Sequence, residues 1–392
     1  MSTPKIIAFY LPQYHPTPHN DEWWGKGFTE WTNVARAKPL FRGHEQPHIP
    51  GELGFYDLRL PEVREAQANL AREYGIYGFC YYYYRFEKGK NELELPIKEV
   101  LKSGKPNFPF MICWANQTWH KKFWRYDGTS ENKILAEQKY GGKQDYIDFF
   151  YEVLPFFKDK RYIRIDGKPA FMIHKPKEFP DVSKLIEIWN SLAKENGLSG
   201  IYFIGYINAS LTKTYNGDLS IKERFKNLGT TPDVLTDKNI VIGKGFDAVT
   251  LNRQYIVKWS ANYLQKLIRI IKRFVFRRPY IIEYKNVIQT LVGTEDKDEN
   301  VFPIVLPNWD HTPRSQYGGE VWTNSTPNLY KQYLIDVLNE LKDKQIEHQI
   351  VFLKAWNEWG EGNYLEPSFK WGRKYLEATQ EALNEFELTY DH

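Results

Sequence analysis

The stretch IVFLKAWNEWGEGNYLEP, residues 350–367, joins an apolar run to a segment rich in glycine, tryptophan and glutamate. The run at 350–353 has the length and the β-branched start of a buried strand, and the residues after it follow no regular period. Two carboxylates, Glu358 and Glu361, stand three residues apart in that second part. The pattern therefore places a carboxylate pair just beyond the C-terminal end of a buried strand.

A carboxylate pair in such a place can divide the work of glycosidic bond cleavage. One carboxylate stays ionised as base or nucleophile, and the other holds a proton for the leaving group. The neighbouring Trp356, Trp359 and Tyr364 suit this chemistry, because flat aromatic faces pack against the C–H faces of sugar rings. The alternative is a surface turn with two solvated glutamates. Three aromatic residues and two glycines directly after an apolar strand disfavour it.

Similar apolar runs recur along the whole chain and predict eight strands, at 6–11, 78–84, 108–114, 170–174, 201–206, 246–251, 301–306 and 350–353. Helical patterns lie between most of them and after the last, at 60–74, 92–102, 145–157, 182–196, 259–276, 328–344 and 372–386. Eight such alternations are typical of a (β/α)8 TIM barrel. No break in composition indicates a second domain. We therefore expect one α/β barrel domain over residues 1–392, with a long active-site loop at about 12–59.

In such a barrel the functional residues lie in the segments that follow the strands. Here those segments are rich in aromatic and hydrogen-bonding side chains. In the run 81–84, alternate tyrosines should face the core, and Asn116 and Asp310 could equally cap the following helix or turn. The candidate substrate-binding residues are Tyr14, His15, Trp31, Tyr82, Tyr84, Trp114, Asn116, Trp309, Asp310, Trp356, Asn357 and Trp359.

Composition narrows the class of protein. The 392 residues include 13 Trp and 27 Tyr, more than a core needs, which favours an aromatic-lined cleft. A net charge of +4 is small for this length and does not indicate a nucleic-acid surface. Cys80 and Cys113 lie inside apolar runs, so we expect buried free thiols. The N-terminus resembles no signal peptide, which predicts a cytoplasmic protein.

The motifs of several other classes are missing from the sequence. It contains no Walker loop, no G-x-G-x-x-G after a strand and no G-x-S-x-G elbow, which argues against a nucleotide cofactor and a serine hydrolase. His15, His48 and His311 have no metal-ligand spacing. We therefore expect neither a cofactor nor a metal.

The segment 259–278 has a charge character of its own. It contains six Lys and Arg residues and no acidic residue, and its apolar residues recur at helical spacing. A barrel helix with a solvated basic face is one interpretation. The other is a surface that meets anionic lipid or a lipid-linked glycan, at the inner membrane surface.

Several motifs, in order, resemble a known family. They are FYLPQYH at 9–15, FTEW at 28–31, PGELGFYDLR at 50–59, WAN at 114–116 and WNEWGEG at 356–362. Together they resemble the WbsX family, described as glycosyltransferases of bacterial surface-polysaccharide clusters and related to the family 99 glycoside hydrolases, the endo-α-mannosidases. The resemblance covers nearly the whole chain.

The resemblance implies a (β/α)8 barrel with its catalytic carboxylates in an E-W-x-E-G motif. In those hydrolases the first glutamate is the base, which deprotonates the 2-hydroxyl of the sugar, and the second is the acid. By match, Glu358 is the base and Glu361 the acid. The chain departs from the pattern at Gly360, where the hydrolases carry a larger polar residue, and at Gln117, where many relatives have Glu.

The sequence therefore predicts a retaining glycoside hydrolase or transglycosidase. Its expected partner is a bacterial surface polysaccharide or an oligosaccharide, free or lipid-linked, and not a nucleic acid. The first alternative is a glycosyltransferase of O-antigen, lipopolysaccharide or capsule biosynthesis, although the sequence has no D-x-D motif for a nucleotide-sugar donor. The second is a non-catalytic carbohydrate-binding barrel.

Overall fold

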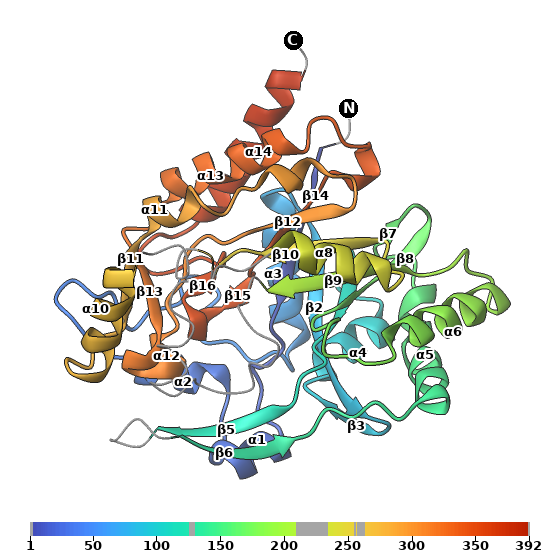
Figure 1. The fold of residues 1–392 in the computed structure, drawn as a ribbon, viewed down its shortest axis with the longest axis horizontal. Helices are drawn as coiled ribbons and strands as arrows, with labels where there is room; N and C mark the ends of the chain where they lie inside the picture. The colour runs from blue at the N-terminus through green and yellow to red at the C-terminus, as the bar shows by residue number, and fades with distance from the viewer. Residues whose placement is uncertain (1–2, 125–129, 209–233, 255, 257–262, 391–392) are drawn as a thin grey trace.

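The computed structural model of the chain describes residues 3–124, 130–208, 234–254, 256 and 263–390 (Figure 1). Within these residues eight parallel strands form a barrel, and β1 closes it by pairing with both β2 and β14. The strands are β1 Lys5–Tyr10, β2 Ile76–Glu87, β4 Phe110–Trp114, β8 Lys168–Ile173, β9 Tyr202–Asn208, β10 Ala248–Asn252, β12 Val301–Val305 and β14 Ile350–Leu353. This confirms the predicted (β/α)8 barrel.

Helices lie between the strands along the chain and cover the outside of the barrel (Figure 1). Seven of them correspond to the helical patterns of the sequence, although residues 259–262 of the basic segment lie outside the described residues. These are α3 Pro61–Glu73, α4 Leu95–Ser103, α5 Lys143–Lys158, α6 Val182–Glu195, α10 Tyr263–Phe274, α13 Pro327–Glu340 and α14 Lys374–Tyr390. Four more were not predicted from the sequence: α1 Pro18–Trp24, α2 Glu30–Arg36, α8 Val234–Gly243 and α11 Tyr284–Ile288.

Short elements decorate the loops. A hairpin of β5 Trp119–Trp124 and β6 Ser130–Ala136 follows β4, and β11 Tyr280–Glu283 pairs with β13 Glu320–Thr323. After β12 comes the one-turn helix α12 Thr312–Ser315, and after β14 a small hairpin of β15 Asn357–Glu358 and β16 Asn363–Tyr364. The remaining short strands are β3 Lys90–Glu92 and β7 Arg164–Ile165.

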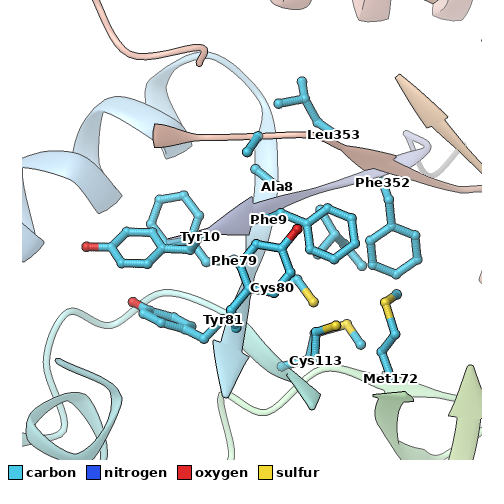
Figure 2. Packing of buried hydrophobic residues seen from close by; sticks show 14 of the residues in the cluster. Ala8, Phe9, Tyr10, Phe79, Cys80, Tyr81, Cys113, Met172, Phe352 and Leu353 are labelled. Carbon is cyan, nitrogen blue, oxygen red and sulfur yellow. The ribbon is translucent and has the colours of Figure 1, made fainter. Parts of the chain in front are cut away.

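Side chains fill the interior of the barrel (Figure 2). The ring of Phe9 from β1 lies 5.3 Å from that of Tyr82 and 5.5 Å from that of Phe352, measured between centroids. Cys80 and Cys113 are buried and free, as predicted. Because the interior is packed, a ligand can bind only at an end of the barrel or on its outside.

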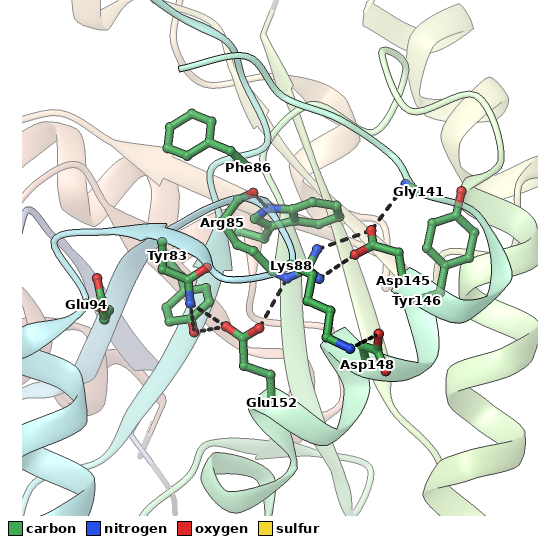
Figure 3. A network of polar contacts seen from close by, with 12 residues as sticks. Tyr83, Arg85, Phe86, Lys88, Glu94, Gly141, Asp145, Tyr146, Asp148 and Glu152 are labelled. Carbon is green, nitrogen blue, oxygen red and sulfur yellow. Dashed lines mark hydrogen bonds and ion pairs between the residues drawn. The ribbon is translucent and has the colours of Figure 1, made fainter. Parts of the chain in front are cut away.

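The tyrosine run of β2 divides between two faces, as the period of a strand requires. Tyr83 points outward and donates a hydrogen bond of 2.5 Å to Glu152 of α5 (Figure 3). Arg85 points the same way, with Nη2 2.6 Å from Asp145, and its guanidinium lies over the ring of Phe149. These contacts fix the end of β2 against α5 and leave the alternate tyrosines on the opposite face.

Candidate active site

The β15–β16 hairpin carries both glutamates and is tied to the end of β1. The amide of Trp356 donates to the carbonyl of Phe9 at 2.8 Å. The side chain of Asn357 accepts from the amide of Leu11 at 2.8 Å and donates to its carbonyl at 3.0 Å. Tyr14 donates to the carbonyl of Asn357. Because these anchors are buried, the hairpin presents Glu358 and Glu361 at the C-terminal end of the barrel strands.

One guanidinium joins three carboxylates at this place. Nη1 of Arg314, on α12, lies 2.6 Å from Oε1 of Glu361 and 3.4 Å from Oε2 of Glu358. Its Nε donates to Glu30, on α2, at 2.8 Å. Glu30 is 2% exposed and Glu358 5%. The arginine therefore offsets part of the repulsion among three nearly buried carboxylates.

Two further basic groups approach only one member of the pair. Nζ of Lys354 lies 3.7 Å from Oε2 of Glu361, and Nε2 of His311 lies 3.6 Å from Oε1. The same lysine lies over the ring of Trp309, 4.9 Å from its centroid. Positive charge is therefore concentrated around Glu361 rather than around Glu358.

This asymmetry separates the two pKa values. Burial, followed by the charge of Glu361, raises the pKa of Glu358 to about 8. Burial alone would also raise the pKa of Glu361, but Lys354, Arg314 and His311 lower it to about 2. These opposite shifts favour a single shared proton at neutral pH, with Glu358 the more readily protonated member of the pair.

We expected Glu361 to lie against aromatic surface with a raised pKa and Glu358 to be ionised. The pKa shifts run in the opposite directions, because the basic residues surround Glu361.

Aromatic side chains of β2 complete one side of the site. Burial and then the charge of Glu358 raise the pKa of both Tyr82 and Tyr84. His174, directly after β8, stacks on Tyr206 of β9 with centroids 4.5 Å apart. Burial and the charge of Lys354 lower the pKa of His174 to about 3, so its imidazole is neutral. The ends of β2, β8, β9 and β14 therefore meet at the carboxylate pair.

Several predicted binding residues pack against the hairpin that carries the carboxylate pair. Trp356 is fully buried and packs on Phe79, and Trp359 is 1% exposed and donates to Glu366 at 2.7 Å. Trp31 donates to the carbonyl of Tyr56 and packs on Trp359. Tyr14 and Asn357 join the hairpin to the N-terminal segment, as described above. These side chains hold the hairpin in place, so little of their surface is accessible to a sugar.

Two other predicted binding residues make their contacts away from the carboxylates. Trp114 is 2% exposed, donates to the carbonyl of Arg85 and packs on Phe149 of α5. Asn116 accepts from the amide of Lys175 at 2.7 Å and so joins the ends of β4 and β8. Trp114 faces the layer between strands and helices, because the alternation of β4 turns it outward. In both residues the side chain contacts neighbouring elements of the barrel rather than the carboxylate pair.

The last three predicted residues differ in their surroundings. His15 is 2% exposed, and burial lowers its pKa. Trp309 is 3% exposed and stacks on His311, which reaches Glu361. Asp310 accepts hydrogen bonds from Gln46 and Thr312 and lies 2.8 Å from Nε2 of His44. Trp309 therefore borders the basic side of the pair, whereas Asp310 anchors a loop.

Sequence reasoning did not identify Glu30 and Arg314 as members of the site. Glu30 lies in the FTEW motif, which carried part of the family resemblance, so a signal for it existed. Arg314 lies on a one-turn helix four residues after Asp310, and nothing in its local sequence distinguishes it from a surface arginine.

Comparison with known proteins gives the following relatives. A sequence model for the family "Glycosyltransferase WbsX" matches residues 6–379. Two proteins described as "Uncharacterized protein WxcX", from two strains of Xanthomonas campestris pv. campestris, are 34% and 33% identical to the chain over 382 residues. The matches cover 96% of the chain and 49% of each relative. The chain thus spans about half the length of the curated relatives it matches.

Solved structures of similar fold include an endo-α-mannosidase of family GH99 from Bacteroides thetaiotaomicron, with TM-scores of 0.54 and 0.52 in two structures. The identities are 16% and 15%, and the alignments cover 98–99% of this chain and 98% of that enzyme. A "Glycoside hydrolase-like protein" also has a TM-score of 0.54, at 14% identity, over 98% of this chain and 94% of its own. At these identities the similarity concerns the fold.

Proposed function

The chain belongs to the family described as glycosyltransferase WbsX and is a carbohydrate-active enzyme, and we propose that it is a retaining glycoside hydrolase or transglycosidase of the endo-α-mannosidase type. Its proposed substrate is a bacterial surface polysaccharide or oligosaccharide. The observation that supports this best is the buried pair Glu358 and Glu361 at the C-terminal end of the barrel, joined by Arg314 and shifted in pKa in opposite directions.

Cleavage of a glycosidic bond needs one proton donor and one proton acceptor. We assign Glu361 as the donor to the leaving oxygen and Glu358 as the base that takes a proton from a sugar hydroxyl, which are the roles the family resemblance implies. Because the surroundings of the pair raise the pKa of Glu358 and lower that of Glu361, this assignment requires that a bound substrate shift the shared proton toward Glu361.

The hydrogen bonds that a substrate can form would favour transfer of the proton from Glu358 to Glu361. A sugar hydroxyl that donates to Glu358 stabilises its ionised form and lowers its pKa. A glycosidic oxygen can only accept, so it stabilises the protonated form of Glu361. Glu361 can turn toward that oxygen only after its ion pair with Arg314, 2.6 Å long, has broken. Glu30 then retains the arginine through the bond to Nε.

Two substitutions test this assignment. Glu361→Gln should cripple turnover of natural glycans but spare activated glycosyl fluorides, because fluoride needs little protonation to leave. Glu358→Gln should abolish turnover of both, because no leaving group replaces the missing base. A general acid or base typically contributes about 10²–10⁴-fold in rate. The assay is fluoride release from a panel of α-glycosyl fluorides, with Arg373→Gln as an exposed control.

The same assay separates the alternatives. Transfer of sugar from a nucleotide donor, without turnover of any fluoride, would replace the proposal with the glycosyltransferase function that the family name describes. Binding of a glycan without turnover, and equal behaviour of both Gln variants and the wild type, would leave a carbohydrate-binding barrel. Interchanged effects of Glu358→Gln and Glu361→Gln would reverse the two roles and keep the reaction.

A second surface bears on where the enzyme acts. Helix α10 and the residue directly after it expose Leu264, Ile268, Ile271 and Val275, which recur at intervals of four, three and four residues. The amide of Val275 donates to the carbonyl of Ile271 at 2.8 Å, so the helical turn continues and the four residues share one face. Their exposed fractions lie between 41% and 68%. Lys272, Arg277 and Arg278 are exposed around them. We propose that this face, the α10 stripe, contacts an anionic membrane surface on which a lipid-linked glycan is presented.

Within the described residues, no helix has both the length and the apolar character that crossing a membrane requires.

A further inference from the structure

A cavity of about 570 Å³ lies beside the carboxylate pair but does not include it. Its volume falls within the range of small-molecule sites. We call it the β16 cavity, after the strand that forms part of its wall. It is lined by residues 43–49, by Asn308 and Asp310, by 321–326, by Tyr364 and 368–371, and by Tyr375.

The wall between this cavity and the catalytic pair is thin and is built from the pair's own hairpin. Asp310 donates its amide to the carbonyl of Glu361 at 2.7 Å. Tyr364 lines the cavity and stacks on Trp359 with centroids 3.6 Å apart. A Cβ atom placed on Gly362 would lie 2.7 Å from that of Asp310, so the two segments are in close contact. The cavity is therefore separate from the carboxylates yet adjacent to them.

Aromatic side chains form much of the lining, as in sites that bind sugar rings. Phe369 is 83% exposed, the largest exposed fraction among the large apolar side chains of the described residues. Trp371 is half-buried beside it, with its ring 6.1 Å from that of Tyr375. A ring this open to solvent is accessible to a ligand. These rings offer flat faces along one side of the cavity.

The charges of the lining are already balanced. Asp310 is satisfied by Gln46, Thr312 and His44, and although burial would raise its pKa, the hydrogen bond from His44 helps to keep it below the usual value. Glu45 pairs with Lys370 at 2.5 Å. The charged groups of the lining are thus already engaged by hydrogen bonds or an ion pair within the protein.

Polar groups without partners accompany these rings. Oδ1 of Asn308 and Oε1 of Gln46 are buried and have no hydrogen-bond partner within the described part of the chain. An unsatisfied buried polar atom typically costs about 1–3 kcal/mol. Burial also lowers the pKa of His48, so its ring is neutral and one of its nitrogens accepts. A ligand rich in hydroxyl donors, with small side-chain adjustments, can satisfy such acceptors.

Flat apolar faces, hydrogen-bond acceptors and balanced charge are together the properties of a site for a neutral sugar. We propose that the β16 cavity binds a second, unreacting neutral sugar unit of the glycan. The inference rests on the proposed function for the class of ligand, but not for the identity of the catalytic residues. The β16 cavity is distinct from the proposed catalytic site, since neither Glu358 nor Glu361 lines it.

Saturation-transfer-difference NMR on the whole chain tests this inference. The probes are methyl α-mannoside, methyl α-glucoside, methyl β-galactoside, N-acetylglucosamine and rhamnose. Phe369→Ala removes the most exposed ring, and Ile49→Trp fills the cavity from a lining residue that is 40% exposed. Tyr151→Ala is the matched control, because Tyr151 is an aromatic residue of α5, 48% exposed and outside the lining.

At least one probe should give a signal with the wild type, with Tyr151→Ala and with the double variant Glu358→Gln/Glu361→Gln. Its affinity should fall about two- to tenfold in Phe369→Ala and further in Ile49→Trp. A signal unchanged in both cavity variants would overturn the proposal, and so would the absence of any signal with the wild type. In either case, turnover of glycosyl fluorides would leave the proposed function standing. Failure of that turnover, with cavity binding intact, would refute the function alone.

Discussion

Gly360 is the residue at which the E-W-x-E-G motif of this chain departs from the hydrolases it resembles, and its surroundings explain the glycine. A Cβ atom added to it would lie 1.6 Å from Oε1 of Glu30 and 3.1 Å from Nε of Arg314. The space that a side chain would need is thus occupied by an ion pair from two other elements. Gly360 and the Glu30–Arg314 pair are therefore parts of one arrangement.

Gly360→Ala should disrupt this arrangement. The added methyl group forces Glu30 away from Arg314, and overpacking of this kind typically costs about 1–3 kcal/mol. We expect a lower melting temperature and a loss of turnover, measured by calorimetry and by fluoride release. Gly243→Ala, at the end of α8, is the control, since a Cβ there meets nothing within 4 Å. Equal behaviour of the two variants would refute the steric argument.

The pH dependence of kcat/KM should report the shared proton. Above its pKa of about 8 the pair loses that proton, so the rate should fall about tenfold per pH unit. Arg314 lowers the pKa of both glutamates, so Arg314→Gln should move this decline to higher pH. The measurement is a pH profile of the wild type and of Arg314→Gln, with Arg373→Gln as control. A decline that stays in place in Arg314→Gln would contradict the assigned electrostatics.

The sequence indicated the pair Glu358 and Glu361 but not the charged residues around it. Glu358 and Glu361 are adjacent in the chain, so their proximity could be predicted. Arg314 and Glu30 come from segments 284 residues apart, and only the closed barrel brings them together. The pKa shifts of the pair depend on such contacts, which the local sequence around Glu361 does not contain.

Among the elements, β2 and β4 show how alternation assigns residues to opposite faces. In β2 the outward Tyr83 donates a hydrogen bond to Glu152. Tyr82 and Tyr84 point the other way, and the charge of Glu358 contributes to raising their pKa values. In β4 the same rule turns Trp114 toward α5. An aromatic residue at a strand end is therefore a binding residue only if its position in the alternation faces the barrel axis.

Trp114→Ala should accordingly behave as a core substitution. Removal of a buried tryptophan typically costs about 3–5 kcal/mol, so the melting temperature should fall strongly while affinity for any bound sugar stays the same. Trp24→Ala, at a tryptophan that is 37% exposed, should change stability by only about 0.5 kcal/mol. Thermal melts and sugar titrations of both variants provide the measurements. Weaker sugar binding in a stable Trp114→Ala protein would return Trp114 to the binding site.

Elements with strong periodicity could be predicted, and those held by tertiary pairing could not. The barrel strands are continuously apolar because both of their faces are buried. The β15–β16 hairpin has strands of only two residues, the β5–β6 hairpin interrupts its aromatic residues with His and Lys, and β11 and β13 pair across 36 intervening residues, from Glu283 to Glu320. Their sequences carry no periodic signal of their own, so they were absent from the prediction.

For the whole molecule, barrel closure brings together at one end segments from residues 30, 82, 174, 314 and 358, which explains why one site draws on most of the chain. The extent of the domain over 1–392 and its long loop at 12–59 stay predictions. The relatives from Xanthomonas campestris pv. campestris are about twice as long, so the activity and partners of the whole protein are proposals.

The α10 stripe predicts how the whole molecule contacts a membrane surface. A barrel helix should bury its apolar residues against the strands, yet Leu264, Ile268, Ile271 and Val275 are exposed. Each basic residue near an anionic surface contributes about 1 kcal/mol, and each buried methylene about 0.8 kcal/mol. The protein should therefore sediment with phosphatidylglycerol vesicles at low salt, bind less in high salt and fail to bind phosphatidylcholine vesicles. Ile268→Glu/Ile271→Glu should abolish sedimentation, whereas Ile346→Glu/Leu388→Glu, at two exposed aliphatic residues outside the helix, should not. Equal sedimentation of both double variants would show that the stripe is not the contact surface.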